Sequence, residues 1–469
     1  MNKFLIFSSI ILLFLISSLN ANIILMPYLQ CVTSNSIYVM VECNTTDTVT
    51  VNYGLTTGLG SAAKTEIIAM TTFGVPITTY IHKVKLSNLQ SNTVYYYRAV
   101  QGSSLSSIFS FRTAVLPGTN FRFLWMSDTQ DGNVVHDKVN QKMILRNAYF
   151  SLYGGDLSRD STYTYWKNDF FRTYELNIIS SVPFFSSPGN HEGWNQNTKT
   201  FEMNPQNFSG TQDYYSFDYG DVHFISINNA ISYVIGSQQY NFIQSDLAAS
   251  NKLWKIAYFH KSAYVGGGAG EDTAMKRISQ NLFVPNHVDI VFTGHSHFYQ
   301  HNLISGIHHM VMGGAGGSLA TPTNASYTIR SIRKNHYGVI DMSPGTLFLR
   351  VYDTLDVQID SVRIDKATNI NNQNEKIGEF HLNQNYPNPF NPETKISFEI
   401  KNNSGNKPVF ASLKIYNILG NEICTLINDL LKPGNYNVSF DGSGIPTGIY
   451  FYKFSTDERT ETKKMVLLK

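Results

Sequence analysis

Residues 149–156, Tyr-Phe-Ser-Leu-Tyr-Gly-Gly-Asp, decide the fold. A short run rich in aromatic residues predicts a buried strand. The two glycines let the backbone turn sharply after it, so the Asp156 carboxylate can point back over the strand end. In α/β domains, ligands bind at the carboxyl ends of the strands. The stretch therefore predicts a strand that delivers a carboxylate to a site at one edge of a sheet.

The same order, an apolar run and then a polar group, occurs four more times along the chain. The runs are 123–126, 183–185, 254–259 and 290–292, and the polar groups after them are Ser127-Asp128, Gly189-Asn190-His191-Glu192, His260 and Gly294-His295-Ser296-His297. Asp, Asn and His are hard-to-borderline metal ligands. Each signal alone is weak, but the ordered set predicts a metal site assembled by a sheet.

Three sections of the chain differ in their pattern. Residues 22–115 alternate short strands (37–41, 49–54, 94–98, 108–113) with turns, which predicts a β-sandwich of about 100 residues. In residues 120–365 strands alternate with helical stretches, one capped by Ser237 and running to Ala249, another opened by Glu271-Asp272. That alternation indicates a layered α/β domain. Residues 366–378 are polar and form a linker, and 379–469 are a second β section.

Composition limits the function classes. A chain of 469 residues is long enough for two to four domains. The net charge of +2, without a dense basic block, gives no support to nucleic-acid binding. The 13% of aromatic residues argues against a disordered chain.

The N-terminus indicates export. Lys3, the apolar stretch 4–16 and the small residues before Ala21 predict a signal peptide over residues 1–21. A membrane anchor is the alternative, but the stretch is shorter than the roughly 20 residues that a span needs. We expect a mature chain without a transmembrane segment. Cys31 and Cys43 flank a turn at unequal distances, which would hold them beyond the roughly 7 Å limit between bridged Cα atoms, so we predict no disulfide between them.

The strand-end groups suit a site with two metals. A carboxylate such as Asp156 can bridge two cations about 3.5–4 Å apart. Asn190 offers an amide oxygen, and His295 and His297 alternate along an extended segment. A hydroxide formed on such a metal pair attacks phosphorus in line. His301 stays open as a further candidate because it follows the metal loop. Six other histidines are expected to be surface or core residues, namely His136, His223, His287, His308, His309 and His336.

At these residues the chain resembles the purple acid phosphatases within the calcineurin-like metallophosphoesterases. The family's motifs are Asp-x-Gly, Gly-Asp-x-x-Tyr, Gly-Asn-His-(Asp/Glu), Val-x-x-His and Gly-His-x-His. Their order is kept here at Asp128, Asp156, Asn190-His191-Glu192, His260 and His295/His297, and Gly313-Gly314-Ala315-Gly316-Gly317 is similar too. The resemblance covers about residues 24–360. It implies a four-layer α/β/β/α metallophosphoesterase core flanked by two β-sandwich domains, of which 22–115 is fibronectin-III-like.

The resemblance also implies roles for the matching residues. Asp128, Asp156 and His297 would hold the first metal, and Asp156, Asn190, His260 and His295 the second. His191 would face the phosphate and act with Asp156 in catalysis. The cofactors would be two divalent or mixed-valence ions of Fe, Zn or Mn.

The chain departs from the family in two regions: within the metal-binding motifs, at Gln130 and Arg159, and in the loop after His260. Gln130 stands at the motif's glycine, and Arg159 at the tyrosine ligand whose bond to ferric iron gives the purple colour. We therefore expect a colourless site. Gln130 would supply an amide oxygen or only stabilise its loop; Arg159 would clamp phosphate or pair with Asp160. Residues 265–270, Val-Gly-Gly-Gly-Ala-Gly, replace a loop that carries substrate-facing histidines in plant members, which leaves the general acid open.

The last 90 or so residues resemble the type A sorting domain of the type IX secretion system. The matching segments are 386–392, 434–436, 448–450 and 464–469. The resemblance implies passage through the type IX machinery of a Gram-negative cell, to the medium or the cell surface. A carbohydrate-binding or adhesive β-sandwich is the alternative.

Together these features predict a secreted, acid phosphatase-like hydrolase of phosphate monoesters. A phosphodiesterase or nucleotide hydrolase of the same fold is the nearest alternative, and a catalytically inactive surface-binding protein is the alternative from another class.

Overall fold

The computed structural model describes residues 22–72, 74–75, 77–131, 134–193, 195–207, 210–366, 380–400, 408–456 and 460–469. The predicted signal peptide and all but Lys366 of the predicted linker lie outside these residues. The chain divides into two compact units, Met1–Ala367 and Thr368–Lys469. Each unit is described by itself.

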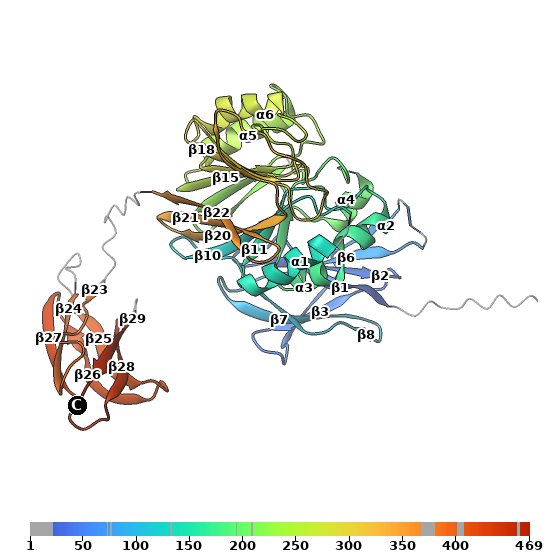
Figure 1. Cartoon of the computed structure of the whole chain (residues 1–469). Helices are drawn as coiled ribbons and strands as arrows, with labels where there is room; N and C mark the ends of the chain where they lie inside the picture. Colours follow the sequence, from blue (N-terminus) through green and yellow to red (C-terminus); the bar gives the residue numbers. More distant parts are fainter. Residues whose placement is uncertain are drawn as a thin grey trace, which may run out of the picture. The chain divides into compact units, whose positions relative to one another are not determined.

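Two sheets form the centre of the first unit (Figure 1). The ten-stranded sheet has the order β22 (Gln358–Asp365), β21 (Thr346–Asp353), β20 (His336–Ser343), β10 (Phe121–Met126), β11 (Phe150–Tyr153), β12 (Phe184–Ser186), β1 (Ile23–Gln30), β2 (Ile37–Cys43), β6 (Tyr80–Leu86) and β5 (Ile67–Met70). The seven-stranded sheet has the order β13 (Tyr215–Tyr219), β14 (Val222–Ser226), β15 (Trp254–Phe259), β16 (Ile290–Thr293), β18 (Ile307–Met312), β17 (Tyr299–Ile304) and β19 (Thr328–Ile332). All five runs predicted to be strands ahead of a polar group are strands.

Helices cover the outer faces of these two sheets. In β10, Phe123 and Trp125 pack between the sheets, whereas Leu124 and Met126 face α1 (Val134–Met143) and α3 (Thr173–Ile179). On the far side, the seven-stranded sheet packs against α5 (Gln238–Ala249) and α6 (Thr273–Ile278), the latter continued by the π-helical turn η3 (Ser279–Phe283). The result is the predicted four-layer α/β/β/α core, with three apolar interiors between four layers.

The helix caps lie where the sequence predicts them. Ser237 Oγ accepts the backbone N–H of Tyr240, and Asp272 accepts that of Met275. Both bonds satisfy a donor that the first helical turn leaves free. The apolar side chains that follow, Ile243 and Leu247 among them, are buried.

The N-terminal section is joined to the core through a shared sheet. Strands β1, β2, β6 and β5 extend the ten-stranded sheet, β1 pairing parallel to β12 at Gln30 and Phe184. The facing sheet contains β3 (Thr50–Gly54), β4 (Ser61–Lys64), β7 (Val94–Gln101), β8 (Ser104–Leu105) and β9 (Phe109–Arg112). The two-sheet arrangement was predicted; its continuity with the core was not. Cys31 and Cys43 are free, as predicted, since Cys43 lies opposite Ile23.

The second unit is a pair of antiparallel sheets. One contains β23 (Phe380–Leu382), β24 (Glu393–Ile400) and β27 (Gly434–Asp441); the other contains β26 (Glu422–Leu431), β25 (Val409–Asn417), β28 (Gly448–Thr456) and β29 (Thr460–Leu467). Phe398, Leu413 and Tyr452 pack between them. Among the described helices of the whole chain, none combines the length and the apolar character that crossing a bilayer requires.

One ionisable cluster in the core makes stability depend on pH. His223 in β14 is 7% exposed and lies 2.8 Å from both Asp218 Oδ1 and Asp246 Oδ2. Burial lowers the pKa of His223, but the two carboxylates raise it more, to about 9 from 6.5. A raised folded-state pKa stabilises the protein fully below pH 6.5 and loses that contribution as the pH rises through 9.

We therefore expect His223→Gln to lower the thermal midpoint of the first unit at pH 6 but hardly at pH 9.5. The difference corresponds to about 1–3 kcal/mol, discounted because Asp218 is half exposed. Thermal unfolding followed by circular dichroism at both pH values measures it. An equal loss at both would contradict the assignment of the effect to charge.

Candidate metal centre

The carboxyl ends of the two central sheets meet at one place, and the predicted ligands lie there. From the ten-stranded sheet come Asp128 after β10, Asp156 after β11 and Asn190 after β12. From the seven-stranded sheet come His260 after β15, and His295 with His297 after β16. Strands distant in sequence thus deliver their polar ends to one cluster because parallel strands share an edge.

Two groups of side chains that could hold a metal ion share Asp156. Asp156, His260 and His295 form one group; Asp128, Asp156 and His297 form the other, with ligand atoms within 4.8 Å of one another in each. His260 Nε2 is 3.1 Å from Asp156 Oδ2, 3.1 Å from His295 Nδ1 and 3.2 Å from Asn190 Oδ1. His297 Nε2 is 3.3 Å from Asp128 Oδ1. Five of the six predicted ligands belong to these two groups, and the sixth, Asn190, lies beside them in contact with His260.

Backbone carbonyls orient two of the imidazoles. His260 Nδ1–H donates to the Gly154 carbonyl (2.8 Å), and His297 Nδ1–H donates to that of Ser318 (2.9 Å). A carbonyl only accepts, so Nδ1 carries a proton in both rings, and Nε2 is the nitrogen turned toward the carboxylates. A neutral imidazole fixed in this way, beside carboxylate oxygens, is the donor set that zinc, iron or manganese takes in proteins. The residues present therefore fit a metal pair.

The charges in the cluster compensate each other. Burial raises the pKa of Asp156, but the neighbouring His260 lowers it by a larger amount, so that the resulting pKa is about 2. Burial lowers the pKa values of His260 and His297, but Asp156 and Asp128, respectively, raise each to about 9. Burial and His260 lower the pKa of His295 to about 4. The carboxylates thus favour positive charge beside them, which a metal ion also supplies, with release of protons.

The backbone is strained at these positions. Asp128, Asp156 and His295 have φ values of 63°, 52° and 67°, in the left-handed region that non-glycine residues seldom adopt. Such strain clusters where a site requires a special side-chain direction. Gly155 allows the close approach of two loops, because a Cβ there would lie 2.5 Å from the Gly189 nitrogen.

Residues around the cluster hold it in place. Asp128 accepts the His295 backbone N–H and the Ser127 hydroxyl (2.6 Å). Asp156 Oδ1 accepts the His191 N–H at 2.9 Å. The buried Glu192 accepts the Gly189 N–H and so fixes the turn before Asn190; burial and the nearby Asp156 raise its pKa to about 8. The hydrogen bond from Ser127 to Asp128 was not predicted. The only sequence feature that could have indicated it is that the two residues are adjacent.

The three further candidates, Gln130, Arg159 and His301, differ in position. Gln130 lies at the cluster: with its NH₂ on the Asp128 and Asp156 carbonyls, its side-chain oxygen is 3.2 Å from His297 Nε2. Arg159 lies at the rim, ion-paired with Asp131 (3.3 Å) and Asp169 (3.8 Å) rather than with Asp160 as one alternative proposed. His301 is in β17, where it bonds His308, and is in neither group.

His191 is exposed beside the cluster. Its Nδ1–H donates to the Arg159 carbonyl (3.0 Å), and its Nε2 lies 3.8 Å from Asp156 Oδ2. The glycine loop after His260 is fixed at one end: Gly266 N–H donates to Gln300 Oε1, and the Gly266 carbonyl accepts the Thr323 N–H. Its other end, Gly268 to Gly270, is exposed.

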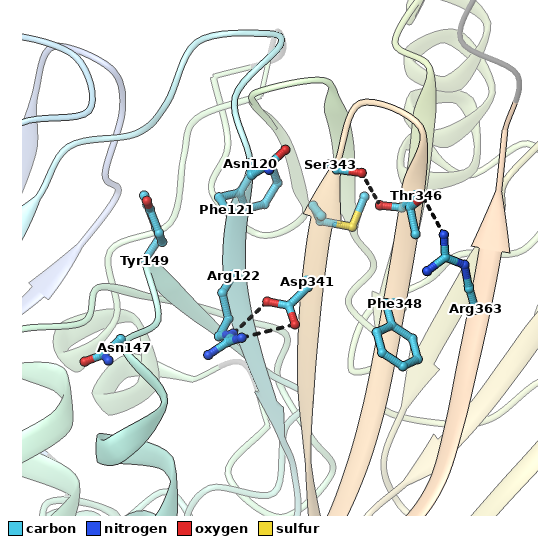
Figure 2. A pocket seen from close by; sticks show the side chains of 11 residues that line it. Asn120, Phe121, Arg122, Asn147, Tyr149, Asp341, Ser343, Thr346, Phe348 and Arg363 are labelled. Carbon is cyan, nitrogen blue, oxygen red and sulfur yellow. Dashed lines mark hydrogen bonds and ion pairs between the residues drawn. The ribbon is translucent and has the colours of Figure 1, made fainter. Parts of the chain in front are cut away.

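A pocket of about 610 Å³ lies at the opposite end of β10 (Figure 2). It is lined by Phe121, Tyr149 and Phe348, and Arg122 and Asp341 pair within it. Phe121 and Tyr149 stand at or before the amino ends of β10 and β11, whereas Asp128 and Asp156 follow the carboxyl ends. The pocket is therefore separate from the cluster.

Comparisons with known proteins agree with this geometry. Residues 121–299 match the calcineurin-like phosphoesterase family, 27–113 the purple acid phosphatase N-terminal domain, and 384–468 the secretion system C-terminal sorting domain. Purple acid phosphatases 15 and 22 of Arabidopsis thaliana are 28% and 29% identical over 47% of this chain and 49% and 53% of their own. The chain thus spans about half the length of these curated relatives.

Two solved structures share the fold. A purple acid phosphatase from seeds of yellow lupin (Lupinus luteus) has a TM-score of 0.64 at 21% identity, over 72% of this chain and 74% of that one. PhoD has a TM-score of 0.53 at 13% identity, over 72% and 88%.

With the strand-end cluster and these matches together, the chain has a calcineurin-like phosphoesterase domain that follows a purple acid phosphatase N-terminal domain and precedes a secretion system sorting domain.

Proposed function

We propose that the protein is an exported hydrolase of phosphate monoesters with two metal ions. The observation that carries this proposal is the pair of ligand groups that share Asp156. Asp128, Asp156 and His297, with Gln130 as a further oxygen donor, would hold one ion. Asp156, Asn190, His260 and His295 would hold the other. Two bound ions would supply Lewis acidity to the phosphoryl oxygens and lower the pKa of a water nucleophile.

The remaining groups would act on the substrate. Because the Arg159 carbonyl fixes the proton on His191 Nδ1, the Nε2 atom is the one available to the ester. With a second proton on Nε2, the imidazolium would stabilise the phosphate or give that proton to the leaving oxygen. The Arg159 guanidinium, 43% exposed at the rim, would attract the dianion of a monoester. This cation supports a monoester over a diester.

The two chain ends support export. We propose a signal peptide over 1–21 and a type IX sorting domain over 379–469, joined by the linker 366–378 to the catalytic domain over 120–365, which follows the fibronectin-III-like domain over 22–115. The match to a secretion system sorting domain supports the C-terminal part of this scheme. The protein would then act at the cell surface or in the medium.

We expect Asp156→Asn and His297→Ala each to reduce hydrolysis of p-nitrophenyl phosphate by at least about 1,000-fold, because each removes a donor from the proposed metal pair. Metal analysis of protein purified without chelator should show a matching loss of bound ion. Asp160→Asn is the control, since that nearby carboxylate bonds the Thr162 N–H and belongs to neither group. Unchanged turnover in the two variants would refute the proposal. If the native protein bound metal but hydrolysed no phosphate ester, the alternative of a catalytically inactive surface-binding protein would be favoured.

We expect Gly317→Ala to weaken metal binding about 10- to 100-fold, an effect like that of losing a partner that orients a ligand. A Cβ at Gly317 would lie 2.5 Å from His297 Cε1, so the ring must move. Titration of the chelated, purified protein with Zn²⁺ measures the change. Gly118→Ala is a matched glycine control with open space around its Cβ position, although its φ of 83° adds local strain. Equal affinities of Gly317→Ala and native protein would contradict the packing argument.

We expect kcat/KM for p-nitrophenyl phosphate to exceed that for bis-p-nitrophenyl phosphate by at least about tenfold, since only the monoester presents a dianion to Arg159. Arg159→Met should narrow that ratio. A preference for the diester in the native protein would instead favour the phosphodiesterase alternative.

A further inference from the structure

We infer that the N-terminal β section positions the His191 side of the site through Glu42. Glu42 would be a positioning residue, because it acts through the segment 158–170 and touches neither substrate nor metal. The inference rests on the proposed function, since it assigns a structural support to the residue that would protonate the leaving group.

An ion pair crosses the boundary between the N-terminal section and the core. Glu42 in β2 has a fully buried carboxylate. Its Oε1 accepts the Thr79 hydroxyl and the Tyr163 hydroxyl, each at 2.7 Å, and its Oε2 lies 2.5 Å from Lys167 Nζ. Tyr163 opens the short helix α2 (Tyr163–Tyr165), and Lys167 is in the π-helical turn η2 (Trp166–Phe170). Because a buried charge without its partner is costly, this contact holds the turn strongly.

Hydrogen bonds extend from that turn to His191. Asp169, in the same turn as Lys167, accepts the Arg159 backbone N–H at 2.9 Å. The Arg159 carbonyl accepts His191 Nδ1–H at 3.0 Å, and the His191 backbone N–H bonds Asp156. Hydrogen bonds, joined by short stretches of backbone, therefore connect the turn to the ring that would face the ester.

Further contacts hold the residues between these points. Asn197 Nδ2–H donates to the Ser161 carbonyl (2.9 Å), and its Oδ1 accepts the Thr72 N–H (3.3 Å) from the N-terminal section. Gly74 lies so close to Thr162 that a Cβ would be 2.7 Å from the Thr162 Cβ. The segment between Asp156 and Asp169 is thus packed against the N-terminal section at several points.

The same boundary offers a control contact that leads elsewhere. The Tyr97 hydroxyl, from β7, donates to the Ser180 carbonyl at 2.8 Å, after the end of α3. Tyr97→Phe removes one buried hydrogen bond across the boundary without touching segment 158–170. It therefore reports what a general loss of contact between the two parts does.

The test compares a poor and a good leaving group. Protonation matters for the alkoxide of glycerol 2-phosphate and little for p-nitrophenolate. We expect Glu42→Gln and Tyr163→Phe to reduce kcat/KM for glycerol 2-phosphate about tenfold but for p-nitrophenyl phosphate less than threefold, with Tyr97→Phe unchanged on both. Tyr163→Phe removes one hydrogen bond to Glu42 but keeps the Glu42–Lys167 ion pair. We therefore expect this variant to fold even where Glu42→Gln does not. Equal losses on both esters, or no loss in the folded variants, would overturn the inference.

Two further measurements separate this inference from the proposed function. In a His191→Ala background, Glu42→Gln should cost less than a further twofold on glycerol 2-phosphate; a full tenfold loss there would overturn it. Hydrogen exchange of peptides covering 158–170 should be faster in Glu42→Gln than in native protein or Tyr97→Phe. Unchanged hydrogen exchange in Glu42→Gln would overturn the inference that Glu42 holds this segment. Faster exchange, in a protein whose native form hydrolyses no ester, would support that inference and refute the proposed function.

Discussion

The Asp156 carboxylate is the group on which the rest of the site depends. It follows the central strand β11 and lies within reach of ligand atoms from both sheets. A carboxylate this deeply buried is costly unless it is paired. His260 and the His191 N–H compensate it, and both come from other strand ends. The two sheets must therefore meet with their carboxyl ends together, which is the geometry that the apolar interior between them maintains.

The sequence predicts the parts of this arrangement that depend on local pattern. The five strands are short apolar runs, and each is followed within four residues by a candidate ligand, so both strand and ligand follow from residue order alone. The helix caps Ser237 and Asp272 are equally local. The four-layer order followed from the resemblance, and the alternation of Phe123 and Trp125 with Leu124 and Met126 explains it physically, since one strand serves two apolar interiors.

What could not be predicted depends on contacts between distant residues. The sequence gives Arg159 a neighbouring carboxylate in Asp160, but the backbone directs Asp160 to the Thr162 N–H and places Asp131 and Asp169 at the guanidinium. Likewise, nothing local in β1 indicates that it pairs with β12. Glu42 lies in a strand of the N-terminal section, and only the folded chain shows that two of its partners are 121 and 125 residues away.

Arg159, at the position of the family's tyrosine ligand, is compatible with the proposed ligand set. A guanidinium beside a metal pair would repel the ions. The Arg159 guanidinium, however, is paired with Asp131 and Asp169, and its Cζ lies 4.9 Å from the centroid of the Tyr165 ring. The cation is thus held at the rim, where a dianionic ester would approach. On the other side, the Gln130 oxygen faces His297 and offers a neutral donor. In the proposed site, an amide oxygen in place of an anionic phenolate would lower the negative charge around the first group, and this would favour divalent over trivalent ions there.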